Sequence, residues 1–96
     1  MVLHTLNKST FAYDLSVALN AMSPDDSLLL IEDGVYTALD EVAVSRLQAA
    51  GIRISLLTPD AEARGITDRI PAKLTQVTYE NFVELACASD KTVAWF

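Results

Sequence analysis

Short apolar segments alternate along this chain with longer segments in which apolar residues recur every three or four positions. The first kind predicts strands, and the second kind predicts helices with one apolar face. Strands are expected over five ranges, namely residues 2–6, 28–31, 52–57, 73–77 and 92–96. Such an alternation is typical of an α/β fold, here a single-domain open, mainly parallel five-stranded sheet with helices on both faces. The order of the strands does not follow from one sequence.

Two apolar stripes define the first two helices. One stripe begins at Phe11 and predicts a helix over residues 11–22. The other stripe runs from Val35 to Leu47 and predicts a single, continuous second helix. Gly51 stands where a left-handed C-terminal cap belongs, so the second helix should end just before it.

Capping residues mark the start of the other two helices. Thr58 is followed by a proline at the first helical position and should cap a third helix, which Gly65 keeps short. Thr78 should cap a fourth helix over residues 79–88.

The chain has 96 residues, of which 51% are hydrophobic, and a formal net charge of −6. This length predicts one domain, residues 1–96, with one continuous core. The apolar fraction is rich for a small monomer, so part of the apolar surface is expected to face a partner. The seven basic residues form no run, which argues against direct binding of nucleic acid by this chain.

The composition also bears on where the protein works. One cysteine cannot form an internal disulfide, and the start of the chain lacks the cationic and apolar regions of a secretory signal. The longest apolar run, residues 28–31, is far shorter than the roughly 20 residues that cross a bilayer. We therefore expect a cytoplasmic protein with no membrane segment.

The turn Glu32-Asp33-Gly34 follows an apolar strand, where α/β proteins often bind ligands. A phosphate-binding turn needs several glycines or a lysine, and here two carboxylates stand at the same place. An acid/base pair is also disfavoured, because adjacent residues on an extended segment point to opposite sides. We expect instead that Gly34 permits a tight turn and that Asp33 caps the second helix.

The loop of residues 7–10 is the nearest approach to an anion site, with Asn7, Lys8, Ser9 and Thr10 before a helix. It has a faint likeness to the hydroxyl-rich phosphate loop of flavodoxins, but the chain lacks long aromatic loops to hold a flavin ring. Capping of the helix explains the same residues. No cofactor is expected.

His4 and Cys87 are the only histidine and the only cysteine. His4 lies inside a strand and is expected to be a buried, hydrogen-bonded imidazole, and no other ligands stand near enough in sequence for a metal site. Cys87 follows the apolar residues of the last helix near its C-terminus, where the helix dipole opposes a thiolate. We expect a buried, inert thiol and no catalytic residue.

Five segments in collinear order carry a resemblance across nearly the whole chain: LHTLNKS, LLLIEDGVYTAL, ARGI, YENFVEL and KTVAWF. Together, in order, spacing and length, they resemble the TusB family, also called the DsrH family. The resemblance implies a small α/β fold of the DsrE/DsrF/DsrH superfamily.

The resemblance also implies a function. Proteins similar to TusB assemble with TusC-like and TusD-like subunits into a heterohexamer, which relays persulfide sulfur from TusA to TusE for 2-thiouridine formation at the tRNA wobble position. The sulfur-carrying cysteine belongs to the TusD subunit. DsrH proteins of sulfur-oxidising bacteria carry a cysteine in the first helix, but residues 11–22 contain none and Cys87 does not match that position. The resemblance therefore implies a noncatalytic subunit of the tRNA-thiolation branch.

An alternative stays open. The chain would then be an independent small flavodoxin-like binding domain or a sulfurtransferase, acting through the loop from Asn7 to Thr10 or through Cys87. As a subunit of a complex, the chain is expected to self-associate through its surplus of apolar surface when it is isolated, whereas a chain that stays monomeric would favour the alternative.

Overall fold

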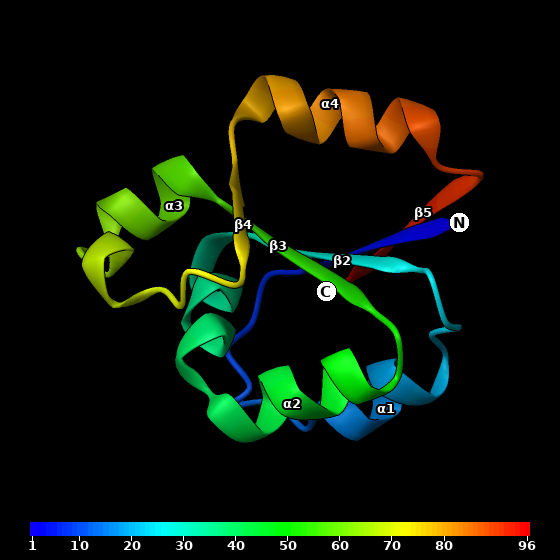
Figure 1. Cartoon of the computed structure of the whole chain (residues 1–96), viewed down its shortest axis with the longest axis horizontal. Helices are drawn as coiled ribbons and strands as arrows, with labels where there is room; N and C mark the ends of the chain where they lie inside the picture. The colour runs from blue at the N-terminus through cyan, green and yellow to red at the C-terminus, as the bar shows by residue number, and fades with distance from the viewer.

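The computed structural model describes residues 1–96 and contains one five-stranded sheet with the order β4-β3-β2-β1-β5 (Figure 1). Every neighbouring pair of strands is parallel, so the expected mainly parallel α/β sheet is confirmed. The strands are β1 Val2–Leu6, β2 Ser27–Leu30, β3 Arg53–Leu57, β4 Thr75–Val77 and β5 Lys91–Trp95.

The helices are unevenly divided between the two faces of the sheet. Helices α1 and α2 lie on one face, and α4 alone lies across the other (Figure 1). The chain steps from β1 through β4 in one direction and then returns across the whole sheet to β5. Right-handed crossovers place the connection that reverses direction on the opposite face. The helical segments are α1 Leu15–Asn20, η1 Glu32–Leu39, α2 Glu41–Ala49, α3 Thr58–Ala63, η2 Thr67–Arg69 and α4 Tyr79–Ala88.

The first helix is shorter than the sequence predicts. It begins at Leu15 because the carboxylate of Asp14 accepts a hydrogen bond from the backbone N–H of Ser16 and so caps the helix there. Phe11 lies before the helix and is 69% exposed. The prediction that Phe11 belongs to the buried face of a helix over residues 11–22 is wrong.

The second predicted helix is divided into two. Residues 32–39 form the 3₁₀ helix η1, and α2 begins after Asp40, whose Oδ1 accepts a hydrogen bond from the backbone N–H of Ala43 at 3.2 Å. The apolar stripe runs through both parts, because 3₁₀ and α-helices both return to one face every three or four residues. After α2 the backbone of Gly51 has φ +79°, which confirms the left-handed cap.

Helices α3 and α4 differ in how their N-termini are capped. Thr78 caps α4 as predicted: its Oγ1 accepts from the N–H of Asn81 at 3.1 Å, and the Asn81 Oδ1 accepts from the N–H of Thr78 at 3.2 Å. Thr58 is already the first residue of α3, and Leu57 occupies the capping position without a side-chain hydrogen bond. The prediction that Thr58 caps the third helix is therefore wrong by one residue.

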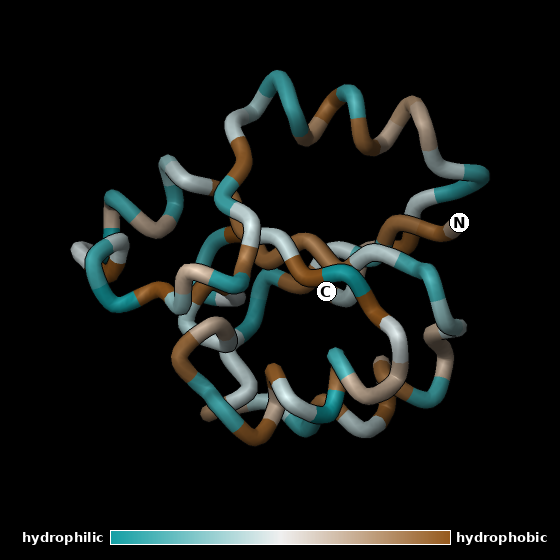
Figure 2. The backbone as a smooth tube through the Cα atoms, in the orientation of Figure 1, coloured by the Kyte–Doolittle hydropathy of each residue, from teal (hydrophilic) through white to brown (hydrophobic).

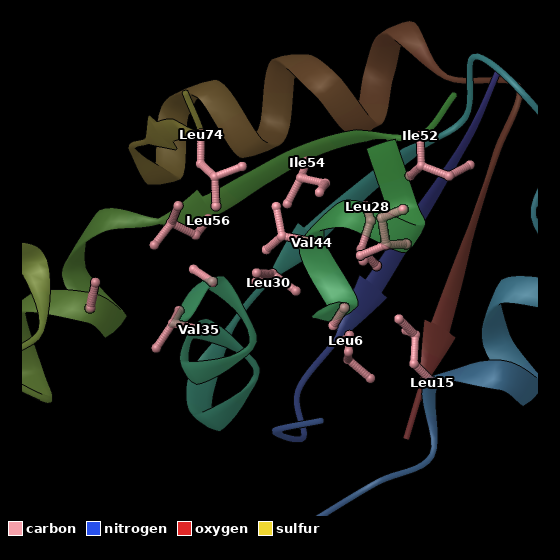
Figure 3. Close-up of a cluster of buried hydrophobic side chains, with 14 of the residues drawn as sticks. Leu6, Leu15, Leu28, Leu30, Val35, Val44, Ile52, Ile54, Leu56 and Leu74 are labelled. Carbon is pink, nitrogen blue, oxygen red and sulfur yellow. The ribbon is translucent and has the colours of Figure 1, made fainter. Parts of the chain in front are cut away.

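The apolar core is correspondingly uneven. A cluster of 15 buried residues fills the space between the sheet and the α1, η1 and α2 face, where Val44 of α2 lies close to Leu30 and Ile54 (Figure 3). A second cluster under α4 has four buried residues, namely Leu3, Leu29, Leu57 and Val77. Figure 2 shows the helices alternating between polar and apolar residues around the apolar strands. None of the helices combines the length and apolar character needed to cross a membrane.

Candidate functional site

The turn after β2 is joined to α3 by its acidic residues. The Nε of Arg64 donates to Asp33 Oδ1 at 2.9 Å, and the backbone N–H of Glu32 donates to Asp60 Oδ2 at 2.6 Å. The N–H that a phosphate would need at this turn is therefore bound to a carboxylate. Asp33 pairs with Arg64 and does not cap the second helix, so that prediction is wrong; Asp40 is the cap of α2.

Gly34 is needed because the chain approaches the end of β1 closely. Its N–H donates to the carbonyl of Ile31 at 2.8 Å, as in a tight turn. A Cβ at Gly34 would overlap the carbonyl oxygen of Leu6. The predicted tight turn is confirmed, and the reason for glycine is the close approach to Leu6.

The two hydroxyls of the loop of residues 7–10 both form hydrogen bonds within the chain. Ser9 Oγ accepts from the N–H of Phe11 at 3.1 Å, and Thr10 Oγ1 donates to Asp40 Oδ2 at 2.7 Å. Lys8 places its ammonium 4.2 Å from the ring centroid of Phe96. The carboxylate of Asp40 beside the loop repels an anion, so the loop joins β1 to the junction between η1 and α2.

His4 is buried and hydrogen-bonded, as predicted. Its Nε2 lies 3.1 Å from Asp26 Oδ2, and the indole N–H of Trp95 donates to its Nδ1 at 3.1 Å. An indole nitrogen can only donate, so Nδ1 is unprotonated and Nε2 carries the proton that it donates to Asp26. Both ring nitrogens are therefore engaged, and the imidazole links the end of β5 to the start of β2.

Asp26 holds a buried negative charge beside this imidazole. Burial by itself would raise its pKa, but hydrogen bonds from the backbone N–H groups of Ser23 and Val2 and from His4 lower the pKa to about 2. The carboxylate is therefore ionised at neutral pH and joins β1 to the turn before β2.

Cys87 is exposed, so the expectation of a buried thiol is wrong. The inner side of α4 consists of Phe82, Leu85 and Ala86, which pack on the smaller cluster. Cys87 lies on the outer side, four residues after Val83. The spacing of the apolar residues in α4 did not by itself indicate which side of the helix faces the sheet.

The outer side of α4 carries an exposed stripe, which we define as Tyr79, Val83 and Cys87. Tyr79 is 58% exposed and Val83 is 62% exposed. The three residues are four positions apart and therefore lie along one side of the helix. A helix whose inner and outer sides are both apolar is typical of one that contacts a second surface.

A pocket of about 440 Å³ lies between α4 and the strands beside it, which we call the α4 pocket. Its residues on the strand side are Ser27, Arg53, Ile54, Ser55, Thr75 and Val77. Asn81, Glu84, Leu85 and Ala88 of α4 form the other wall, and Met1 lies at one end. Sequence reasoning missed this pocket; the signal available was serine within the otherwise apolar strands SLLL and RISLL.

Metal binding has no evident site. The structure holds no group of three or more histidine, cysteine, aspartate or glutamate side chains that could bind a metal ion.

The family described as DsrH like protein matches residues 8–92. The chain is 40% identical to protein TusB of Erwinia tasmaniensis over 95 residues, which cover 98% of this chain and 100% of that protein. It is 36% identical to protein TusB of Pectobacterium parmentieri with the same coverage. Among solved structures, the solution NMR structure of protein Tm0979 from Thermotoga maritima has a TM-score of 0.69 and 22% identity, covering 95% of this chain and 97% of that one. This last likeness concerns the fold alone.

Proposed function

Because the chain belongs to the DsrH family, we propose that it is a noncatalytic subunit of a TusBCD-like sulfur-relay complex. In this role it assembles with TusC-like and TusD-like subunits in a cytoplasmic heterohexamer. That complex passes persulfide sulfur from TusA to TusE, and the sulfur is used for 2-thiouridine at the tRNA wobble position. The subunit is connected to TusA and TusE through the complex, and it does not bind tRNA directly.

The observation that carries the proposal is the similarity to proteins called TusB over 98% of this chain and all of theirs. The relationship is not confined to one motif, because it extends over the length of both chains. A role that depends on subunit contacts requires that kind of relationship.

The surface of α4 supports an assembly role. The exposed stripe Tyr79, Val83 and Cys87 presents apolar area outward, and α4 has no fully buried residue of its own. A partner that covers the stripe would remove this area from water, which stabilises association.

The thiol chemistry of the chain supports a noncatalytic role. Cys87 is near the C-terminal end of α4, where the helix dipole does not stabilise a thiolate. The segment around α1 contains no cysteine. Sulfur transfer would then depend on a cysteine of another subunit.

Two measurements test the proposal. Light scattering on the isolated chain, and again after co-expression with TusC-like and TusD-like proteins, should show replacement of the self-associated chain by a mixed complex. A strain lacking this chain should lose 2-thiouridine from its tRNA and recover it when the chain is restored. A monomer in both samples, or normal 2-thiouridine without the chain, would contradict the proposal.

The alternative, an independent binding domain or sulfurtransferase, predicts a different colour or mass for the purified protein. A yellow protein, or added sulfur mass on Cys87, would favour it. The Thr10 hydroxyl of the loop from Asn7 to Thr10 donates to the carboxylate of Asp40, and this negative charge argues against an anion site there.

A further inference from the structure

Strand β5 forms one edge of the sheet and pairs only with β1. It has five residues, whereas β4 at the opposite edge has three. Proteins usually protect an edge strand by making it very short, or by a proline, a bulge or charges along it. The sequence KTVAW contains no proline, its register with β1 is uninterrupted, and its one charge stands at its start. The free edge of β5 is therefore open to another strand.

The hydrogen bonds of β1 show which backbone groups of β5 face outward. The carbonyl of Leu6 accepts from the N–H of Ile31, the residue after β2, so the backbone groups of Leu6 face β2. In a central parallel strand, alternate residues direct these groups to opposite neighbours. The groups of Leu3 and Thr5 therefore face β5.

The register between β1 and β5 then fixes the outer edge. Leu3 lies beside Thr92, and Thr5 lies beside Ala94. A residue in a parallel ladder bonds to the residues on either side of its register partner, so alternate residues of β5, beginning at Lys91, bond to β1. The N–H and C=O groups of Thr92 and Ala94 point away from the sheet, and both residues are exposed.

A second copy of β5 fits this edge in the antiparallel direction. A two-fold axis at Val93 places Thr92 of each copy opposite Ala94 of the other. Such opposed residues exchange both of their N–H···O=C hydrogen bonds, so every outward group of the two strands gains a partner. An axis at Thr92 or at Ala94 would instead leave the other of these residues opposite one outside the strand. The edge is therefore complementary to itself about Val93.

The side chains suit the same register. The axis places Lys91 of each copy opposite Trp95 of the other, on one face of the joined sheets. Lys91 is exposed and has no ion pair within the chain, and Trp95 is only partly buried. The lysine ammonium can therefore form a cation–π contact with the indole ring across the two strands. At the axis, the apolar side chain of Val93 meets its own copy.

We propose that two copies of this chain associate through β5, antiparallel about Val93, so that their sheets become one continuous sheet. The proposal goes beyond the role as a subunit and does not depend on it. The exposed stripe of α4 lies over a face of the sheet and not at its edge, so it stays uncovered in this dimer.

The first test measures amide hydrogen exchange of the ¹⁵N-labelled chain over a dilution series, with the mass followed by light scattering. The amides of Thr92 and Ala94 should exchange at least about tenfold more slowly in the dimer than in the monomer. Those of Val93 and Trp95, which bond to β1, should be protected at every concentration. A chain that stays monomeric overturns the proposal, as does a dimer in which Thr92 and Ala94 exchange as fast as in the monomer.

The second test determines the register. In a mixture of isotope-labelled and unlabelled chains, a filtered nuclear Overhauser effect should connect the Lys91 side chain of one copy with the Trp95 ring of the other. Within one strand these residues are about 13 Å apart, which is too far for a direct effect. A dimer without this signal between copies overturns the register about Val93.

The third test removes one outward N–H. Ala94→Pro loses no bond to β1, because this N–H faces outward, and should weaken the dimer at least about tenfold. Ala94→Val keeps the N–H and is the matched control, with dimerisation like that of the unmodified chain. A folded Ala94→Pro chain that dimerises as tightly as the control overturns the proposal and directs attention to the stripe of α4.

A further pair of variants keeps the proposal testable if the proline disturbs folding. Lys91→Gln should weaken the dimer about tenfold, because the dimer loses the cation–π contact on both sides of its axis. Lys73→Gln, at an exposed lysine before β4, makes the same change of charge and should have no effect. Equal dimer dissociation constants for these two variants would overturn the predicted contact.

Discussion

The two faces of the sheet differ in how firmly their helices are packed. On one face η1 and α2 bury residues of their own, and 15 residues form the cluster beneath the helices. On the other face α4 buries none, and the cluster beneath it has four. The first face stabilises the domain, whereas the second leaves a pocket and an exposed stripe that are available for other molecules.

The largest expected effect compares leucines on the two faces. Leu30→Ala removes a fully buried side chain from the larger cluster and should cost about 3–5 kcal/mol of unfolding free energy. Leu85→Ala on α4 removes a partly buried one and should cost about 1 kcal/mol. Urea denaturation of both variants measures the difference. Equal losses would show that α4 is packed as firmly as α2.

The next effect concerns the close approach of η1 to β1 on the first face. Gly34→Ala should cost about 2–3 kcal/mol, because the added methyl group overlaps the carbonyl of Leu6 and the backbone must move. Gly65→Ala is the matched control: it has φ +66° but open space around it, and should cost about 1 kcal/mol. Thermal unfolding of the two variants measures the difference. A larger loss of stability in Gly65→Ala than in Gly34→Ala would contradict this explanation.

Acid sensitivity should come partly from the buried group on the first face. The pKa of Asp26 is about 2 in the folded chain and about 3.9 when unfolded. A lowered folded pKa gives stability that is fully present above about pH 4 and is lost as the pH falls towards about 2, and the expected contribution is about 2 kcal/mol. Unfolding free energies measured from pH 7 to pH 2.5 should therefore fall less steeply for Asp26→Asn than for the unmodified chain. Asp68→Asn, at an exposed position, should keep the original slope.

The smallest effect distinguishes the outer from the inner side of α4. Cys87→Ser should change the unfolding free energy by less than about 0.5 kcal/mol, because the thiol is exposed, and should leave 2-thiouridine at its normal level. Ala86→Ser, on the inner side, should cost about 1 kcal/mol through a hydroxyl placed in apolar surroundings. Loss of tRNA thiolation in an assembled complex carrying Cys87→Ser would restore the thiol as a functional candidate.

The sequence predicted the class of fold because strand and helix periodicities are local properties. The break at Asp40 was missed, since the apolar stripe from Val35 to Leu47 continues through both a 3₁₀ and an α-helix. Capping by side chains decided the boundary, as it also did at Asp14. The first residues of these helices depend on single hydrogen bonds, which the pattern of apolar residues does not reveal.

The candidate site was less predictable because it depends on how elements meet. His4 was correctly expected in the core, since a central strand is buried whatever its neighbours are. Cys87 was misplaced because α4 has apolar residues on both sides, and only the sheet decides which side is covered. The α4 pocket requires Ser27 and Ser55 to come together from two strands, and one sequence does not give the strand order.

The return of the chain to β5 has a consequence for its synthesis. β5 ends at Trp95 and pairs with β1, which is made before the other four strands. On the ribosome, one edge of β1 therefore has no neighbour until β5 has left the exit tunnel. The nascent chain presents this unpaired edge during the synthesis of every element between the two strands.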